Sequence, residues 1–243
     1  CLWDYDSASL EIAKIWLNKP LASGQSVLLS TPFRVKIPQT FSRLGHVGQS
    51  YQITQWYPKP AVYDKKGWHA MPYLDQGEFY SEFGSYDVSI TLPGNYIVGA
   101  TGDLQTEEEI KWMDSLAQVG ATISYENDTR QKFPPSSSTL KTIRFTQNNV
   151  HDFAWFADKR FIVNMDSCIL ASGKTVDVIT YYTPDQKKDW SKSTTYAKQA
   201  IHHYSSLVGE YPYQVVQVVQ GPESFGGGME YPTITVISPV DNP

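Results

Sequence analysis

Apolar and polar residues alternate in short segments through the first part of the chain, and turn residues separate these segments. Strict alternation over about four to eight residues is typical of a half-buried β-strand. The pattern predicts strands at 26–29, 33–37, 51–56 and 141–145. Pro93 and Gly94 favour a tight turn, and the alternating residues on either side predict two facing strands within 84–104. We therefore expect a β-rich first part with a hairpin at 84–104.

One helical pattern interrupts these strands between Thr106 and Gly120. Thr106 and Glu109 have the spacing of a capping box, and the glutamates at 107–109 fall in the first turn, where the helix dipole favours negative charge. Ile110, Met113, Leu116 and Ala117 form one apolar face, and Gly120 is expected to end the helix. We interpret the glutamates as capping and solvated residues rather than a metal site, because no further ligand residues flank them.

The pattern changes after Phe161. Runs of apolar and β-branched residues predict strands at 176–182, 215–219 and 234–237. Between the first two, apolar positions recur at helical spacing and predict one helix of about five turns, with Trp190, Thr194, Ala197, Ile201, Tyr204 and Val208 on one face and Gly209 after it. We place a domain boundary near residue 165, with one domain over 1–165 and a second over 166–243.

Composition supports a folded chain with a sizeable core. The 243 residues are 41% hydrophobic and 19% charged, which suits one large domain or two smaller ones. The formal net charge is −5 and no basic stripe is present, which argues against a nucleic-acid partner. No apolar run reaches the ~18 residues expected of a membrane span, and no signal-peptide pattern opens the sequence. The sequence assigns no compartment.

Cysteines and histidines offer no metal site or nucleophile in this segment. Cys1 and Cys168 do not form a Cys-x-x-Cys metal-binding motif, although the sequence does not exclude a disulfide between them. His202 and His203 are adjacent, whereas two zinc ligands on one helical face need i, i+4 spacing. The chain contains neither a His-Glu-x-x-His nor a Gly-x-Ser-x-Gly sequence. We therefore expect no catalytic residue and no bound metal here.

The segment from Gly226 to Pro232 is the most unusual part of the sequence. Three successive glycines remove every Cβ and allow another backbone to approach closely. Pro232 suits an edge strand, because it cannot donate a hydrogen bond within a sheet. These residues fit an open edge to which an extended peptide adds as a strand, with Glu230 holding its ammonium terminus. They also fit a flexible glycine loop beside a solvated glutamate.

The residues at 227–231 resemble the Gly-x-Met-Glu-Asn motif of the gluzincin zinc aminopeptidases, the family of membrane alanyl aminopeptidase and the leukotriene-A hydrolases. The Thr-Gln pair within 51–55 is similar to a family segment whose glutamine reaches the substrate amine. Further segments that resemble the family's strand blocks follow in the same order, at 77–80, 85–88, 92–98 and 150–155. The resemblance extends from about residue 30 to the end of the chain.

This resemblance implies a mainly β fold with some α: a β-sandwich-like N-terminal domain, then the leading sheet and first helix of a thermolysin-like catalytic domain. It implies that the parent protein is a zinc-dependent aminopeptidase that removes N-terminal residues from peptides, with zinc polarising the scissile carbonyl. In the parent, Glu230 and Gln55 would hold the free amine of a peptide substrate, and Gly227, Gly228 and Met229 would hold its backbone.

Two departures from the family pattern are visible. Tyr231 stands where the family most often has asparagine. The chain also ends 13 residues after Glu230, before the position of the family's zinc ligands. We therefore interpret the sequence as a fragment truncated at both ends, inactive and free of zinc by itself.

Two other functions fit the sequence. One is a non-catalytic scaffold relative that kept the fold and lost the metal, and the other is an aromatic-rich β-sandwich that binds a glycan or a protein. Truncation also predicts self-association, because an apolar helix face with Trp190, Ala197, Ile201 and Tyr204 loses part of its cover.

Overall fold

The computed structural model describes residues 2–40, 42–72, 79–122, 132–222 and 224–240, which fall into two compact units. Unit 1 comprises residues 1–36 and 57–82, and unit 2 comprises residues 37–56 and 83–243. Two sequence predictions fall on residues that the structure does not describe. One is the disulfide that the sequence did not exclude for Cys1, and the other concerns the first two residues of the segment 77–80. None of the described helices is long and apolar enough to cross a membrane.

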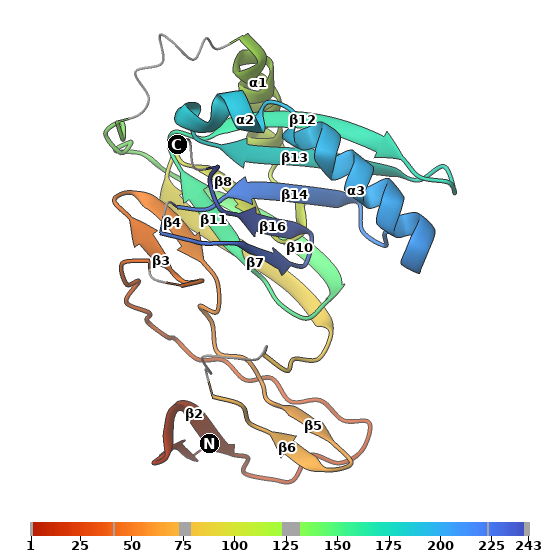
Figure 1. Cartoon of the computed structure of the whole chain (residues 1–243). Helices are drawn as coiled ribbons and strands as arrows, with labels where there is room; N and C mark the ends of the chain where they lie inside the picture. Colours follow the sequence, from red (N-terminus) through yellow and green to blue (C-terminus); the bar gives the residue numbers. More distant parts are fainter. Residues whose placement is uncertain (1, 41, 73–78, 123–131, 223, 241–243) are drawn as a thin grey trace. The chain divides into compact units, whose positions relative to one another are not determined.

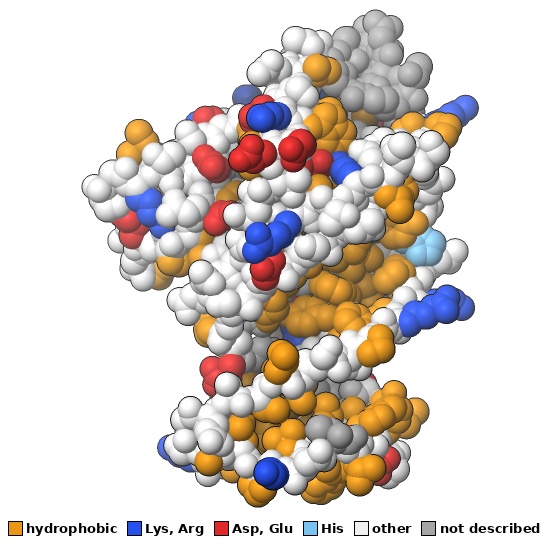
Figure 2. Space-filling view, turned by 180° about the vertical axis from the view of Figure 1, so that it is seen from behind, with side chains coloured by type: hydrophobic (Ala, Val, Ile, Leu, Met, Phe, Trp, Pro, Cys, Tyr) orange, Lys and Arg blue, Asp and Glu red, His pale blue; other side chains and the backbone are white. Residues whose placement is uncertain are grey.

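The described part of unit 1 contains two small antiparallel hairpins, β1 (Leu2–Asp6) with β2 (Ser9–Trp16) and β5 (Val62–Asp64) with β6 (Gly67–His69). The prediction of strands at 26–29 and 33–37 is wrong, because these residues form no strand. Most of their apolar side chains are exposed, and Leu28 is 92% accessible. Figure 2 shows hydrophobic side chains over much of the surface of unit 1. Alternation produces a strand where a neighbouring element buries one face, and these side chains remain in solvent.

The described part of unit 2 contains three sheets (Figure 1). One is antiparallel, in the order β7 (Gly84–Pro93), β10 (Leu140–Val150) and β9 (Asp103–Leu104). Another is antiparallel, in the order β3 (Gly45–Val47), β4 (Ser50–Ile53), β11 (Trp155–Asp158) and β8 (Ile97–Ala100). The strand predicted at 141–145 lies within β10, and the strand predicted at 51–56 ends early, at Ile53.

The prediction of a hairpin at 84–104 is wrong, because β7 and β8 belong to different sheets. β7 pairs with β10, and β8 pairs with β11. A distant loop anchors the turn between them: Gly94 N donates to Thr139 O at 2.8 Å, and the Asn95 amide donates to Pro135 O at 2.8 Å. All four residues of β8 are buried, so this strand needs cover that a two-stranded hairpin does not provide.

The third sheet has five strands, in the order β12 (Ile162–Ile169), β13 (Thr175–Tyr182), β14 (Val215–Gln220), β16 (Ile234–Ile237) and β15 (Gly228–Tyr231). β13, β14 and β16 are parallel, and the outer strands β12 and β15 are antiparallel to their neighbours. The three strands predicted in this part are confirmed. The boundary predicted near residue 165 falls within β12, and unit 2 continues across it. The division into 1–165 and 166–243 stays a prediction.

Helices lie on both faces of this five-stranded sheet (Figure 1). On one face, Met113 of α1 (Glu107–Thr122) joins a buried cluster that includes Tyr181 of β13. On the other face, Ile201 of α3 (Ser193–Val208) packs in a cluster with Val178 of β13. Tyr181 and Val178 are three residues apart on one strand and therefore point to opposite faces.

The prediction of a single helix from Trp190 to Val208 is wrong in one respect, because the chain forms two helices here. A 3-10 helix (Pro184–Gln186) leads into α2 (Lys187–Trp190), and α3 begins at Ser193. Trp190 is buried in a cluster with Tyr182, and the Ser193 hydroxyl donates to Thr180 Oγ1 at 2.7 Å. Both contacts hold the chain against β13 at the junction between the two helices.

The capping box predicted at the start of α1 is also wrong. The Thr106 hydroxyl accepts a hydrogen bond from Arg144 N at 2.9 Å, and Glu109 Oε1 accepts one from Lys141 Nζ at 2.6 Å. Both side chains therefore join the helix to β10 instead of closing its first turn. Gly120 lies inside α1, not at its end. A Cβ there would lie 2.9 Å from a backbone oxygen of β12, so this glycine permits close packing.

The four- and five-stranded sheets pack against each other through a shared apolar core. Ile97 of β8 and Phe156 of β11 belong to the same buried cluster as Tyr181 of β13 and Ile234 of β16. A Cβ at Gly99 would lie 2.8 Å from the Tyr181 ring, so the sheets approach closely at this glycine. The predicted fold class, mainly β with some α, is confirmed.

Candidate functional site

The strand that carries the glycine motif, β15, is an edge strand. It comes last in the order of the five-stranded sheet and pairs antiparallel with β16. Its other side has no strand partner among the described residues. Pro232 and Thr233, the latter with φ +62°, form the turn to β16, so Pro232 does not lie in the edge strand as predicted. Gly228–Tyr231 therefore form a strand at the sheet edge rather than a loop.

Successive side chains of β15 point to opposite faces of the sheet. Met229 packs against the core between the sheets, and Tyr231 is buried within it. Glu230 points to the other face and is exposed. A Cβ added at Gly226 or Gly227 would meet no atom within 4 Å. The edge thus combines unobstructed backbone with an exposed carboxylate.

Gln55 follows β4 with φ +52°, a left-handed conformation that is uncommon for a residue with a side chain. Its Nε2 donates to Asp152 Oδ2 at 3.1 Å, and Asp152 Oδ1 accepts from Phe153 N at 2.7 Å. The Trp56 indole N–H donates to Phe153 O at 3.1 Å. The segment after β4 is therefore fixed on the residues that precede β11, and the Gln55 amide has a defined orientation.

The side chain of Tyr231 lies beside this segment. Its side chain is buried, and burial raises the pKa of its hydroxyl to about 12, with the adjacent Thr54 and Gln55 side chains acting in the opposite direction. Gln55 therefore lies beside the residue that follows Glu230. Glu230 itself leaves β15 on the opposite face. The two predicted amine-binding side chains thus belong to one end of β15 and lie on different sides of it.

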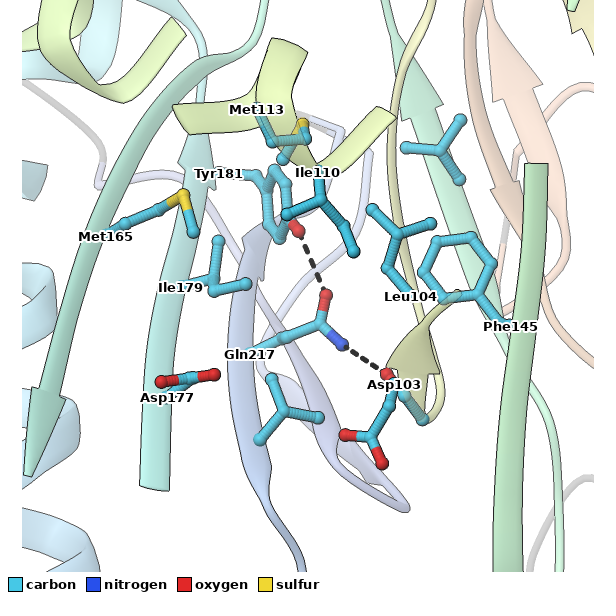
Figure 3. Close-up of a pocket in the computed structure, with 13 residues that line it drawn as sticks. Asp103, Leu104, Ile110, Met113, Phe145, Met165, Asp177, Ile179, Tyr181 and Gln217 are labelled. Carbon is cyan, nitrogen blue, oxygen red and sulfur yellow. Dashed lines mark hydrogen bonds between the residues drawn. The ribbon is translucent and has the colours of Figure 1, made fainter. Parts of the chain in front are cut away.

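A cavity of about 160 Å³ lies between α1, the β9–β10 pair and the five-stranded sheet (Figure 3). Apolar side chains form most of its lining, which includes Leu104, Ile110, Met113, Phe145, Met165 and Ile179. Buried Gln217 accepts from the Tyr181 hydroxyl at 3.0 Å and donates to Ala100 O. Asp103 and Asp177 place carboxylates beside this lining. No local sequence pattern indicates the cavity, because its residues come from seven separate elements.

Two of the solved structures that are similar to this chain match most of its length. A mutant M1 zinc metallopeptidase from Deinococcus radiodurans matches 82% of this chain and 38% of its own, at 16% identity and a TM-score of 0.52. Aminopeptidase A of Legionella pneumophila, in complex with aspartic acid, matches 81% of this chain and 20% of its own, at 12% identity and a TM-score of 0.50. This chain has the fold of the matching part of an M1 metallopeptidase.

The M1 fold confirms, at the level of architecture, the resemblance predicted from the motifs. The chain spans well under half of either M1 structure. No family model matches the sequence, and comparison with curated proteins finds no match.

The part of the M1 fold described here does not fit a zinc centre. Its described residues contain no group of three or more His, Cys, Asp or Glu side chains placed to hold a metal ion. His202 and His203 are exposed on α3. We assign no catalytic step to these residues, and the zinc expected in the parent protein stays a prediction.

Sequence reasoning missed Asp152, which orients Gln55, and the burial of Tyr231 beside Gln55. Asp152 lies 97 residues from Gln55 in the chain, so no local spacing joins them. The available signal was one carboxylate inside the otherwise largely apolar segment 150–155. For Tyr231, the signal was the departure from asparagine at the last motif position.

Proposed function

We propose that this chain is the substrate-holding part of a zinc-dependent aminopeptidase, which removes N-terminal residues from peptides. The proposal rests on β15, which is an edge strand. Glycines with no atom near their Cβ positions precede it, and it carries the exposed carboxylate of Glu230. An unpaired strand edge provides hydrogen-bonding groups for an extended peptide. The M1 metallopeptidase fold of the chain supports the same function.

In this proposal the peptide lies along β15, and Gly226, Gly227 and Gly228 let its backbone come close. The Glu230 carboxylate holds the ammonium group through a charge-assisted contact, which limits cleavage to the first residue. Gln55, oriented by Asp152, lies at the same end of β15 but on its other side, so its neutral amide is expected to contribute less to holding this group than Glu230. Residues 1–165 form the N-terminal domain, and residues 166–243 begin the catalytic domain.

Zinc belongs to the parent protein in this proposal and would polarise the scissile carbonyl. The residues described here would bind and orient the substrate, and they leave the metal to other parts of the parent. The 243-residue chain is therefore expected to be inactive by itself.

Zinc removal tests the proposal. The parent protein is expected to hydrolyse aminoacyl-anilides, to lose this activity on dialysis against a chelator, and to regain it with zinc. The 243-residue chain, measured in parallel, is expected to show neither hydrolysis nor stoichiometric zinc. A parent that binds no zinc and hydrolyses nothing would instead support the scaffold relative. Oligosaccharide affinity without affinity for N-terminal amines would support the binding module.

A further inference from the structure

Thr233 has an unusual backbone conformation for a threonine. It follows Pro232 in the two-residue turn between β15 and β16, and its φ is +62°. A turn with proline at its first central position and a positive φ at the second usually takes glycine or asparagine there. A β-branched residue in the left-handed region is strained, and such strain persists only where the surrounding structure holds it. The conformation therefore points to a role for the threonine side chain.

The side chain of Thr233 is buried and bonded to the segment between β8 and β9. Thr233 is 5% accessible, and its hydroxyl accepts a hydrogen bond from Gly102 N at 2.7 Å. Its carbonyl oxygen accepts another from Gln217 N of β14 at 2.8 Å. Glycine would suit the backbone of the turn and would leave the buried Gly102 N–H without this acceptor. The threonine hydroxyl thus joins the turn after β15 to the segment after β8.

The segment after β8 is bonded in turn to the residues that orient Gln55. The hydroxyl of Thr101, next to Gly102, accepts from Ala154 N at 3.1 Å, and Thr101 N donates to Ala154 O at 2.9 Å. Two residues before Ala154, Asp152 Oδ2 accepts from the Gln55 amide at 3.1 Å. A series of hydrogen bonds therefore connects the part of the fold that carries Gln55 to the turn after β15.

The two ends of β15 are held by different contacts. Glu230 lies three residues before Thr233, near the end of the strand that the turn closes. The glycine end is held separately, because Ser238 N donates to Gly227 O at 2.8 Å. Loss of the Thr233 hydroxyl would therefore displace Glu230 relative to Gln55 and leave the glycine end in place.

We propose that Thr233 is a positioning residue for the amine-binding carboxylate: its buried hydroxyl sets the position of Glu230 relative to the part of the fold that carries Gln55. This inference rests on the proposed function, in which Glu230 holds the ammonium group of a peptide. Thr233 itself does not touch the substrate. Misplacement by about 1 Å of groups that position a substrate can cost about a hundredfold in rate, so a distant hydroxyl affects catalysis through Glu230.

Substitutions at Thr233 in the parent protein test the proposal, with kcat/KM measured on a free-amine substrate and on the same substrate acylated at the amine. Thr233→Val keeps the branched shape and removes the hydroxyl. Thr233→Gly suits the positive φ and also removes the hydroxyl. Both are expected to lower kcat/KM on the free-amine substrate about tenfold and on the acylated substrate far less. Thr233→Ser keeps the hydroxyl and should retain native selectivity.

Thr91→Val is the matched control, because it removes a threonine hydroxyl that bonds to Thr142 between β7 and β10. It should change neither value. Native activity of Thr233→Gly, or equal losses on the two substrates in both hydroxyl-free variants, would overturn the proposal, since Thr233 would then serve only the turn.

Glu230→Gln, measured beside these variants, separates the proposal from the proposed function. A selective loss on the free-amine substrate in Glu230→Gln, with none in Thr233→Val or Thr233→Gly, removes Thr233 alone. Equal losses on the two substrates in Glu230→Gln overturn the proposed function, and the positioning role of Thr233 with it.

Two-dimensional NMR of the 243-residue chain gives a readout that does not depend on activity. Thr233→Val and Thr233→Gly are expected to speed hydrogen exchange of the Gly102 amide by at least about tenfold and to shift the side-chain amide resonances of Gln55. Thr233→Ser and Thr91→Val should do neither. Native Gln55 resonances in both hydroxyl-free variants would contradict the connection between the turn and Gln55.

Discussion

At the scale of single residues, Glu109 and Lys141 show how a charge removed from water depends on its partner. Lys141 Nζ lies 2.6 Å from Glu109 Oε1 and 3.8 Å from the centre of the Trp112 ring. Burial raises the pKa of Glu109 and lowers the pKa of Lys141, and each charge acts against the shift of the other. The pair therefore joins α1 to β10 only while both partners are present.

Lys141→Met is expected to lower the free energy of unfolding by roughly 3–5 kcal/mol, because it leaves the Glu109 carboxylate buried and unpaired. Denaturant unfolding measures this loss. The double variant Glu109→Gln with Lys141→Met is expected to be more stable than Lys141→Met alone, since it removes the unpaired charge. A single variant as stable as the native chain would show that the pair contributes little.

The sequence singled out one residue of each such contact and did not indicate the residue that it contacts. Glu109 was expected to cap its own helix, and its partner lies 32 residues away on β10. Gln55 was predicted from the family resemblance, and its partner Asp152 is 97 residues away. Spacing along the chain reveals contacts within one helix or strand, whereas these contacts depend on how distant strands pack.

At the scale of elements, the close packing of α1 on β12 depends on Gly120. A Cβ at this position would lie 2.9 Å from Val163 O and 3.2 Å from the Ile162 side chain. In an exposed helix, alanine is more favourable than glycine by up to about 1 kcal/mol. Here the helix would have to move away from the strand to make room for it.

Gly120→Ala is therefore expected to destabilise the chain, by about 1–3 kcal/mol, as overpacking in a core commonly does. Gln118→Ala, at an exposed position of the same helix, should be neutral or slightly stabilising. Equilibrium unfolding of the two variants is the measurement. Stabilisation by Gly120→Ala would show that α1 is not held tightly on β12.

Strands were predictable from the sequence where β-branched and apolar residues follow one another and the strand is buried inside a sheet. β13, β14 and β16 carry β-branched and apolar residues and lie inside the five-stranded sheet, so the predicted ranges are close to the observed ones. The segments 26–29 and 33–37 alternate in the same way and form no strand. The predicted hairpin at 84–104 failed because both of its strands pair with partners from 140–158. Alternation of apolar and polar residues indicates a preference for a strand, and the available partner strand decides where a strand forms and with which segment it pairs.

At the scale of the whole molecule, α3 carries an apolar surface that the described residues leave exposed. Trp190, Ala197 and Ile201, expected to lose cover, are buried, whereas Tyr204 is 62% accessible. Leu207 and Val208 on the same helix are 64% and 83% accessible. Large exposed apolar patches commonly mark interaction sites.

We expect the 243-residue chain to self-associate through this end of α3, with an apparent mass that rises with concentration in sedimentation equilibrium. The double variant Leu207→Ser with Val208→Ser should weaken the association, because it removes most of the exposed apolar area. Gln199→Ser changes an exposed side chain elsewhere on the helix and serves as the control. A monomer at every concentration would contradict this expectation.

The central claim for the whole molecule is that the edge strand β15 holds the free amino terminus of a peptide through Glu230. The most direct test measures kcat/KM of the parent protein and of its Glu230→Gln variant on a free-amine substrate and on the same substrate acylated at the amine. The matched control is Glu107→Gln, at an exposed glutamate on α1.

Loss of a charge-assisted contact costs roughly 1.5–3 kcal/mol, or about ten- to a hundredfold in kcat/KM. Glu230→Gln is expected to show this loss on the free-amine substrate and far less on the acylated one, which never makes the contact. Gln55→Ala should show the same selectivity with a smaller effect, and Glu107→Gln should show none. Equal losses on the two substrates in Glu230→Gln would contradict the account, because Glu230 would then not hold the amine.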